Sequence, residues 1–453
     1  MTEPTGDAGH TSNQPRYPRF WEAFRFWLKL GFISFGGPTG QIAILHEELV
    51  DRRKWISESR FLHALNYCML LPGPEAQQLA TYVGWLLHRT WGGIAAGTLF
   101  VLPSVFILHA LSWAYVRFGS VPWVEAIFYG LKPAVLAIVT AAVLRMGKRV
   151  LKNELMGLIA AASFVAIFFL GARFPLIIFA AGFFGLVGGL LGWKSFLVVT
   201  AHVPGDNENG TVIRDDAPCE AHSLPSRGRG LKVLVLCLAL WWIPVLALGV
   251  WLGWDHTLAR QGVFFSKAAM VTFGGAYAVL PYVSQQAVEE YGWLSTGEMI
   301  DGLALAETTP GPLIMVLQFV GFLGAWHQPG ELSPLVAATL GALITTWTTF
   351  LPCFLWIFLG APYIEQLRGN VKLTATLSAV TAAVVGVVLN LAVWFALPVL
   401  FPAHRTVNWF AVGVSVLALA GMVRWRWGIF PVVLGAGCLG LLREVILALK
   451  GVP

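Results

Sequence analysis

Long apolar runs fill this chain, and short polar or charged stretches separate them. Many runs approach the roughly 20 residues that a helix needs to cross a bilayer. They lack the strict apolar-polar alternation of membrane β-strands. Hydrocarbon requires every backbone polar group to be paired internally, so the pattern predicts an all-α polytopic membrane protein. The runs cover approximately 21–50, 61–88, 91–117, 122–146, 155–171, 174–192, 231–253, 262–288, 298–325, 334–360, 374–400, 408–423 and 428–448.

Helix breakers interrupt some of these runs, and the interruptions occur twice. Phe35-Gly36-Gly37 recurs as Phe273-Gly274-Gly275, and Pro72-Gly73-Pro74 recurs as Pro310-Gly311-Pro312, both 238 residues later. The register also pairs Phe26 with Phe264, Lys29 with Lys267, Trp55 with Trp293 and Ser57 with Ser295. This predicts two homologous halves. Paired interruptions in corresponding positions are a sequence pointer to a transporter binding site.

Polar stretches set the predicted domain boundaries. We expect a polar tail over 1–20, a first repeat over 21–193, a flexible linker over 194–230, a connecting transmembrane helix over 231–261 and a second repeat over 262–453. The tail has no apolar core followed by a small-residue cleavage site, so we expect no secretory signal to be removed.

Loop charges favour one topology for the broken runs. Each run is either one kinked span or a re-entrant hairpin. If both are re-entrant, the basic loop Arg52-Arg53-Lys54, the basic loop over 145–152 and the N-terminal arginines share one side, as cytoplasmic loops do. We favour this arrangement.

The same reasoning predicts that the second half is inverted. Arg52-Arg53-Lys54 corresponds to Glu290-Tyr291-Gly292, so basic charge is lost where inversion places the loop outside. Parallel repeats, in which these loop charges carry no topological meaning, are the alternative.

Composition supports a membrane protein and offers little else. The chain of 453 residues is 57% hydrophobic and 12% charged, against about 25% charged residues in soluble proteins. Its net charge of +6 fits basic cytoplasmic loops, and we expect no nucleic-acid partner. The five cysteines are scattered, so we predict neither disulfides nor a metal site. No cofactor motif and no Walker A motif is present.

We expect the chemistry at the breaks, where a new helix N-terminus attracts anions. Proline suits the first helical turn and glycine permits unusual backbone angles. Polar side chains near the breaks can add hydrogen bonds. The candidate substrate-binding residues are Ser34, Gly36, Gly37, Pro72, Gly73, Pro74, Gln77, Gln78, Thr272, Gly274, Gly275, Thr309, Pro310, Gly311 and Pro312.

Four charged residues in apolar runs are further candidates. Lys29 and Lys267 occupy matched positions and suit an anionic substrate, or else they extend to the membrane interface as anchors. Glu75 and Glu307 flank the two Pro-Gly-Pro motifs and are candidate proton carriers. For Glu75, capping of a helix start is the alternative.

These motifs carry a resemblance to a known family. Phe35-Gly36-Gly37-Pro38, the run from Leu71 to Gly84, Phe273-Gly274-Gly275 and Thr309-Pro310-Gly311-Pro312 resemble the chromate ion transporter family in its long, two-domain form. The resemblance covers about residues 20–192 and 262–447. The second half departs from the first, since Ala276 replaces Pro38 and Leu313 replaces Glu75.

The resemblance implies a multi-pass protein of the bacterial inner membrane, not an enzyme, that exports chromate and confers chromate resistance, driven by the proton-motive force. Sulfate is the structural analogue. The implied partners are a chromate or sulfate-like oxyanion and the lipid bilayer; a homodimer is compatible with the sequence, which does not fix the oligomeric state. The residues alone leave open an importer of sulfate or another oxyanion, an anion channel and, remotely, a membrane-embedded chromate reductase.

Overall fold

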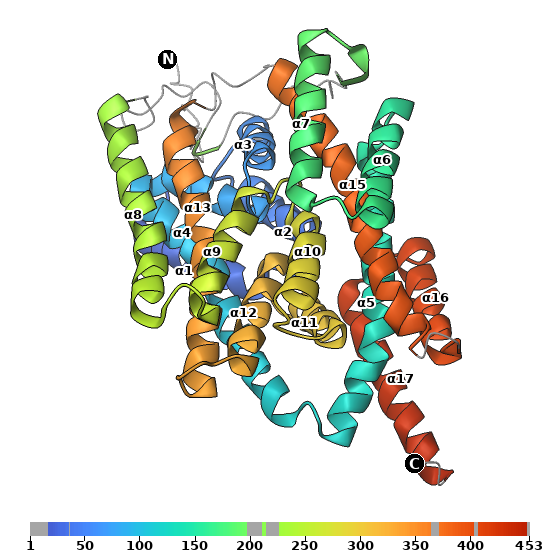
Figure 1. The fold of residues 1–453 in the computed structure, drawn as a ribbon. Helices are drawn as coiled ribbons and strands as arrows, with labels where there is room; N and C mark the ends of the chain where they lie inside the picture. The colour runs from blue at the N-terminus through green and yellow to red at the C-terminus, as the bar shows by residue number, and fades with distance from the viewer. Residues whose placement is uncertain are drawn as a thin grey trace, which may run out of the picture.

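The described residues of the computed structural model form a helical bundle (Figure 1). They are 17–35, 37–196, 211–213, 226–363, 371–402 and 406–450. The first half contains α1 (Phe20–Ile33), α2 (Gly37–His46), α3 (Glu58–Leu70), α4 (Glu75–Phe118), α5 (Pro122–Val150), α6 (Glu154–Leu170) and α7 (Phe174–Leu190). After α8 (Arg227–Leu252), the second half contains α9 (Thr257–Met270), α10 (Ala276–Gln285), α11 (Thr296–Thr308), α12 (Val316–His327), α13 (Pro334–Gly360), α15 (Val371–Leu400), α16 (Trp409–Arg424) and α17 (Ile429–Leu449).

Six of the described helices are long and apolar enough to cross a membrane: α4, α5, α8, α13, α15 and α17. The polytopic all-α prediction is therefore confirmed. The helices α1, α2 and α3 have 14, 10 and 13 residues. At 1.5 Å per residue each is at most about 21 Å long, short of a hydrocarbon core of about 30 Å.

The helices end and begin at the two motifs in both halves. α1 ends at Ile33 and α2 begins at Gly37, while α9 ends at Met270 and α10 begins at Ala276. Likewise α3 ends at Leu70 before the first Pro-Gly-Pro, and α11 ends at Thr308 before the second. Each motif thus separates two half-length helices.

Contacts join the outer ends of the broken helices in pairs. Pro18, just before α1, lies 3.0 Å from His88, where the backbone of α4 leaves the helical conformation. At the other ends, the His46 and Glu58 side chains are 2.5 Å apart, which joins the end of α2 to the start of α3. The start of α1 therefore lies beside the end of the first part of α4, and the breaks are buried, since Ser34 and Thr272 are inaccessible to solvent. The re-entrant topology stays a prediction.

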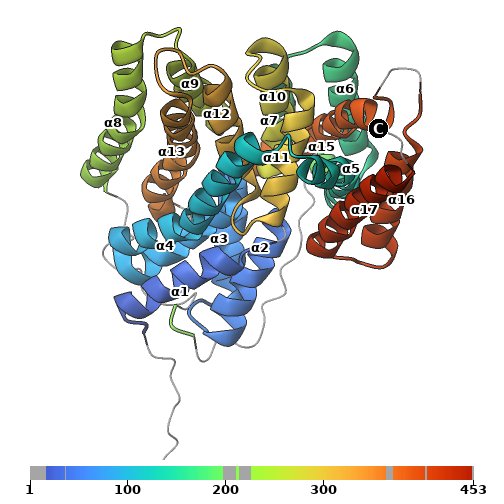
Figure 2. The same ribbon diagram turned by 90° about the horizontal axis from the view of Figure 1, so that it is seen from below.

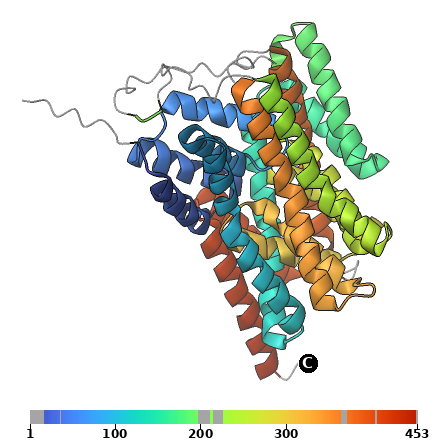
Figure 3. The ribbon, with the colours of Figure 1, turned by 90° about the vertical axis from the view of Figure 1, so that its left-hand side faces the viewer.

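Matched segments of the two halves run in opposite directions. The backbone at Lys54 and Trp55 pairs with Val212 and Ile213 of the linker, which precede α8 in the chain. The matched loop at Tyr291 and Gly292 instead accepts hydrogen bonds from Gln328, whose side chain also contacts Thr257, beyond the end of α8. Figure 1 shows the same inversion for α5 and α15, and Figure 3 shows α8 alongside α13.

The long helices of one half pack against the last helices of the other. Thus α5 contacts α16 and α17, and α15 contacts α6 and α7 (Figure 2). Glycine permits the close approach: a Cβ on Gly130 of α5 would lie 2.1 Å from the Ala436 carbonyl oxygen of α17, and one on Gly386 of α15 would lie 2.0 Å from that of Ala160 in α6. Small residues at interhelical contacts are typical of membrane bundles.

Candidate functional site

At the interior breaks, each Pro-Gly-Pro turn is hydrogen-bonded to the Phe-Gly-Gly break of the other half. The amide of Gly73 donates to the Thr272 carbonyl at 2.8 Å, and the amide of Gly311 donates to the Ser34 carbonyl at 2.7 Å. The four residues are two matched pairs, so the bonds are related by the repeat. The breaks of one half are therefore completed by the other half, and we call this arrangement the crossing.

Sequence-predicted polar side chains make local hydrogen bonds around the crossing, and Gln41, which was not among the sequence candidates, makes one between the two halves. The hydroxyls of Ser34 and Thr272 each donate to the carbonyl four residues earlier, both at 2.6 Å. The Gln78 amide donates to the Pro72 carbonyl at 2.8 Å, and Gln41 donates to the Gly311 carbonyl at 2.5 Å. Gln77 donates to Thr81 and Thr309 to Ala306, each at 3.2 Å. These donors are engaged within the protein.

The central position of each Pro-Gly-Pro turn requires glycine. Their φ angles are +125° at Gly73 and +102° at Gly311, which L-residues with a side chain rarely adopt. A Cβ would also lie 2.7 Å from Cys353 Sγ at Gly73, and 2.5 Å from Ser104 Cβ at Gly311. Backbone conformation and packing therefore impose the same residue.

A cavity of about 480 Å³ lies beside the crossing, between the two halves. The Phe-Gly-Gly breaks of both halves contribute Gly37, Gly274 and Gly275, and Pro38 and Gly40 extend this wall. The remaining lining comes from Met69, Glu75, Ala142, Arg145, Met146, Arg149, Val150, Ala276, Tyr277, Thr381, Met422, Trp427, Gly428 and Ile429. The cavity is the candidate site, because it joins the breaks to charged side chains.

Two arginines supply the positive charge of this cavity. Arg145 and Arg149 lie one turn apart on α5 and both line the cavity. Within the described part of the chain, neither has a carboxylate partner within 4.0 Å. Two unpaired guanidinium groups in one cavity form an arrangement suited to a tetrahedral oxyanion.

Sequence reasoning assigned these arginines to a basic loop and missed them as site residues. The apolar run ends near residue 146, whereas helix α5 continues to Val150. The available signal was their spacing of four residues, which places both on one helix face.

The two candidate carboxylates have different surroundings. Glu75 lines the cavity, and a Cβ on Gly275 would lie 3.8 Å from its Oε1. Glu307 is buried and accepts a hydrogen bond of 2.5 Å from the Tyr277 hydroxyl. Tyr277 itself lines the cavity, so its ring connects Glu307 to the site.

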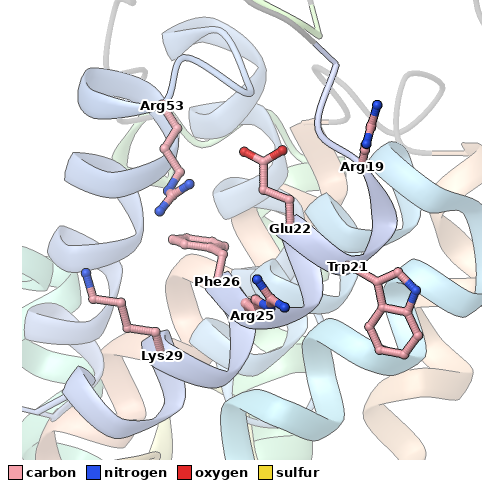
Figure 4. A pocket seen from close by; sticks show the side chains of 7 residues that line it. All are labelled: Arg19, Trp21, Glu22, Arg25, Phe26, Lys29 and Arg53. Atoms are coloured by element: carbon pink, nitrogen blue, oxygen red, sulfur yellow. The ribbon is translucent and has the colours of Figure 1, made fainter.

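The matched lysines lie elsewhere. Lys29 and Lys267 are exposed on α1 and α9 and do not line the cavity. Lys29 instead lines a second cavity of about 390 Å³ between α1 and the segment that carries Arg53 (Figure 4). Of the predicted residues, the 480 Å³ cavity brings together Gly37, Gly274, Gly275 and Glu75, and Gly36 lies outside the described residues.

Comparison with known proteins agrees with the two-repeat architecture. The family model described as "Chromate transporter" matches residues 21–186 and 260–441. The chain belongs to the chromate transporter family. No solved structure matches it.

Three relatives align with this chain over most of their length. The chromate transport protein of Pseudomonas aeruginosa is 32% identical over 94% of this chain and 92% of its own. That of Cupriavidus metallidurans is 30% identical over 85% and 84%, and the probable chromate transport protein of Synechococcus elongatus is 28% identical over 80% and 81%. Family membership and the six apolar helices identify a multi-pass membrane transporter, and its bacterial relatives fit an inner-membrane location.

Proposed function

We propose that this transporter exports chromate from the cytoplasm, driven by the proton-motive force, and thereby confers chromate resistance. The observation that carries the proposal is the 480 Å³ cavity beside the crossing, with two arginines that lack carboxylate partners among the described residues. The names of the relatives supply the substrate class.

The arginines provide the recognition chemistry. A guanidinium group donates two parallel hydrogen bonds to an oxyanion and stays charged at any physiological pH. Two of them match the charge of a dianion such as chromate. Sulfate has the same tetrahedral shape and charge, so we expect it to compete for the site.

The carboxylates provide a route for coupling. Glu75 lies in the cavity with Arg149, and Glu307 is connected to it through Tyr277. A carboxylate that is protonated on one side of the membrane and ionised on the other couples proton entry to oxyanion exit. Inverted repeats around a central site are the architecture in which rocking of the two parts alternates access.

Everted membrane vesicles test the proposal, because their outer surface is the former cytoplasmic face. We expect uptake of radioactive chromate that is stimulated by an imposed proton gradient, is abolished by a protonophore and is inhibited by excess sulfate. Empty-vector vesicles provide the control.

Other outcomes support specific alternatives. Uptake only in right-side-out vesicles would indicate import. Flux without counterflow would indicate a channel, and loss of chromate with formation of reduced chromium would indicate a reductase. The proposed site involves one chain, and the homodimer stays a prediction to be checked by the mass of the purified complex.

A further inference from the structure

The second cavity has a concentration of positive charge. It is lined by Arg19, Trp21, Glu22, Arg25, Phe26 and Lys29 of the α1 region and by Arg53 from the loop before α3. Four cations and one carboxylate therefore surround a volume of about 390 Å³. In Figure 4, Arg25, Lys29 and Arg53 flank the ring of Phe26, whereas Arg19 and Trp21 lie toward the start of α1.

Three of the four cations are available to a ligand. Arg19, Arg25 and Lys29 are exposed and have no ion-pair partner among the described residues. Arg53 is held differently: its guanidinium lies 4.5 Å from the Phe26 ring centroid, and its Nε is 3.5 Å from Glu48. Arg53 is thus held in place by contacts within the protein, whereas the other three cations have no ion-pair partner among the described residues.

The second half provides an internal comparison. The register pairs Arg19 with Thr257, Arg25 with Val263 and Arg53 with Tyr291, while Phe26 and Lys29 pair with Phe264 and Lys267. The buried phenylalanine that packs the helix is kept, and three of the four cations are lost. Glu22 is matched by Arg260, which forms an ion pair with Asp255 at 2.8 Å. Packing of α1 around Phe26 therefore does not require cations at positions 19, 25 and 53.

We propose that this cavity binds the phosphate headgroup of an anionic phospholipid. Beside the cations, Trp21 is 68% exposed, and Phe32 on the same helix is 52% exposed. Aromatic side chains among cations on an amphipathic helix are typical of the membrane interface. Basic clusters there bind anionic headgroups. The aromatic surface favours a lipid over a free oxyanion, which needs no apolar contact. Lys29 then belongs to a lipid site and not to the transport pathway.

Native mass spectrometry of the purified protein in detergent tests this inference with phosphatidylglycerol as the probe and phosphatidylcholine as the neutral comparison. The test variant is Arg19→Gln/Arg25→Gln/Lys29→Gln, which leaves Arg53 and its packing intact. The control variant is Arg260→Gln/Lys267→Gln, which removes exposed cations from the matched helix α9. Each cation near an anionic surface contributes about a fivefold factor, so we expect phosphatidylglycerol to bind the triple variant about 100-fold more weakly, and the control variant as the parent does.

Two results would overturn the proposal. One is parental phosphatidylglycerol binding by the triple variant. The other is displacement of phosphatidylglycerol by millimolar inorganic phosphate or sulfate, which would identify a site for soluble oxyanions. If the triple variant does not fold, the single reversal Arg25→Glu at an exposed position provides the same comparison. Equal binding by that variant and the parent would also reject the lipid site.

Discussion

Removal of the cavity arginines is the sharpest perturbation of the proposed transport site. Arg145 and Arg149 lie four residues apart on α5 and line one cavity, so their Cβ atoms are about 6 Å apart and both guanidinium groups can reach one tetrahedral anion. A hydrogen bond to a charged group contributes about 1.5–3 kcal/mol, or roughly a 10- to 150-fold factor in affinity. Both arginines are exposed, which favours the lower end of that range.

We therefore expect Arg145→Gln and Arg149→Gln each to raise the KM for chromate about 10-fold in everted vesicles. The double variant should have a higher KM for chromate than either single variant, because in each single variant the remaining arginine still binds the anion. Protein levels should stay near the parental level, since neither guanidinium holds an ion pair among the described residues.

Lys148→Gln provides the matched control. Lys148 lies beside Arg149 on the same exposed end of α5 but does not line the cavity. General attraction of anions extends over about 10 Å at 0.1 M salt, so a purely electrostatic effect would appear in this variant too. A KM within twofold of the parent for both arginine variants, or an equal rise for Lys148→Gln, would refute the assignment of the arginines to substrate.

Three further predictions concern coupling, the crossing and topology. Glu75→Gln or Glu307→Gln should remove the pH dependence of vesicle transport while substrate exchange continues. If Glu307 is the proton carrier, Tyr277→Phe should also alter the pH dependence, because this change removes the 2.5 Å hydrogen bond to Glu307. A parental pH profile in all three variants would show that another group carries the proton. Gly73→Ala should lower the melting temperature in detergent, and adding Cys353→Ala should restore part of the loss by relieving the 2.7 Å contact with Cys353, although backbone strain of about 1–3 kcal/mol remains. The control is Gly157→Ala, whose Cβ would meet nothing within 4 Å. Equal melting temperatures for Gly73→Ala and Gly157→Ala would contradict the reasoning. Single cysteines can be placed at Arg52 and Glu290, which are exposed and occupy matched positions. In cells with a permeabilised outer membrane, an impermeant maleimide should label position 290 and leave position 52 unlabelled. Equal or reversed labelling would exclude the predicted orientation.

The sequence predicted the architecture because its signals are local and strong. Glycine and proline within apolar runs break helices wherever they occur, so the ends of α1, α3, α9 and α11 could be placed near the motifs. The inversion followed from basic residues present at Arg52–Lys54 and absent from Glu290–Gly292. Both inferences depend on residue type and position along the chain, without knowledge of contacts.

The candidate site could be predicted only in part, because its decisive contacts join distant segments. The backbone bonds at Gly73 and Gly311 connect the two halves, and a backbone amide carries no residue-specific signal. The matched lysines gave a different difficulty. Lys29 and Lys267 share a register with the buried Phe26 and Phe264, but both lie exposed on the surface of amphipathic helices. Their symmetry thus reflects the common shape of α1 and α9, and their predicted binding of substrate stays untested.

The crossing also has a consequence for how the chain is made. Ribosomes add about 5–20 residues per second, and the partners of Ser34 and Gly73 lie between about 200 and 280 residues further along the chain. For roughly 10–50 s the first half therefore resides in the membrane with an amide and a carbonyl unpaired, and each unpaired group in hydrocarbon costs several kcal/mol. The newly inserted first half should thus be a target for membrane proteases and insertases until the second half arrives. Halves expressed from separate genes should accumulate only when both are made in the same cell.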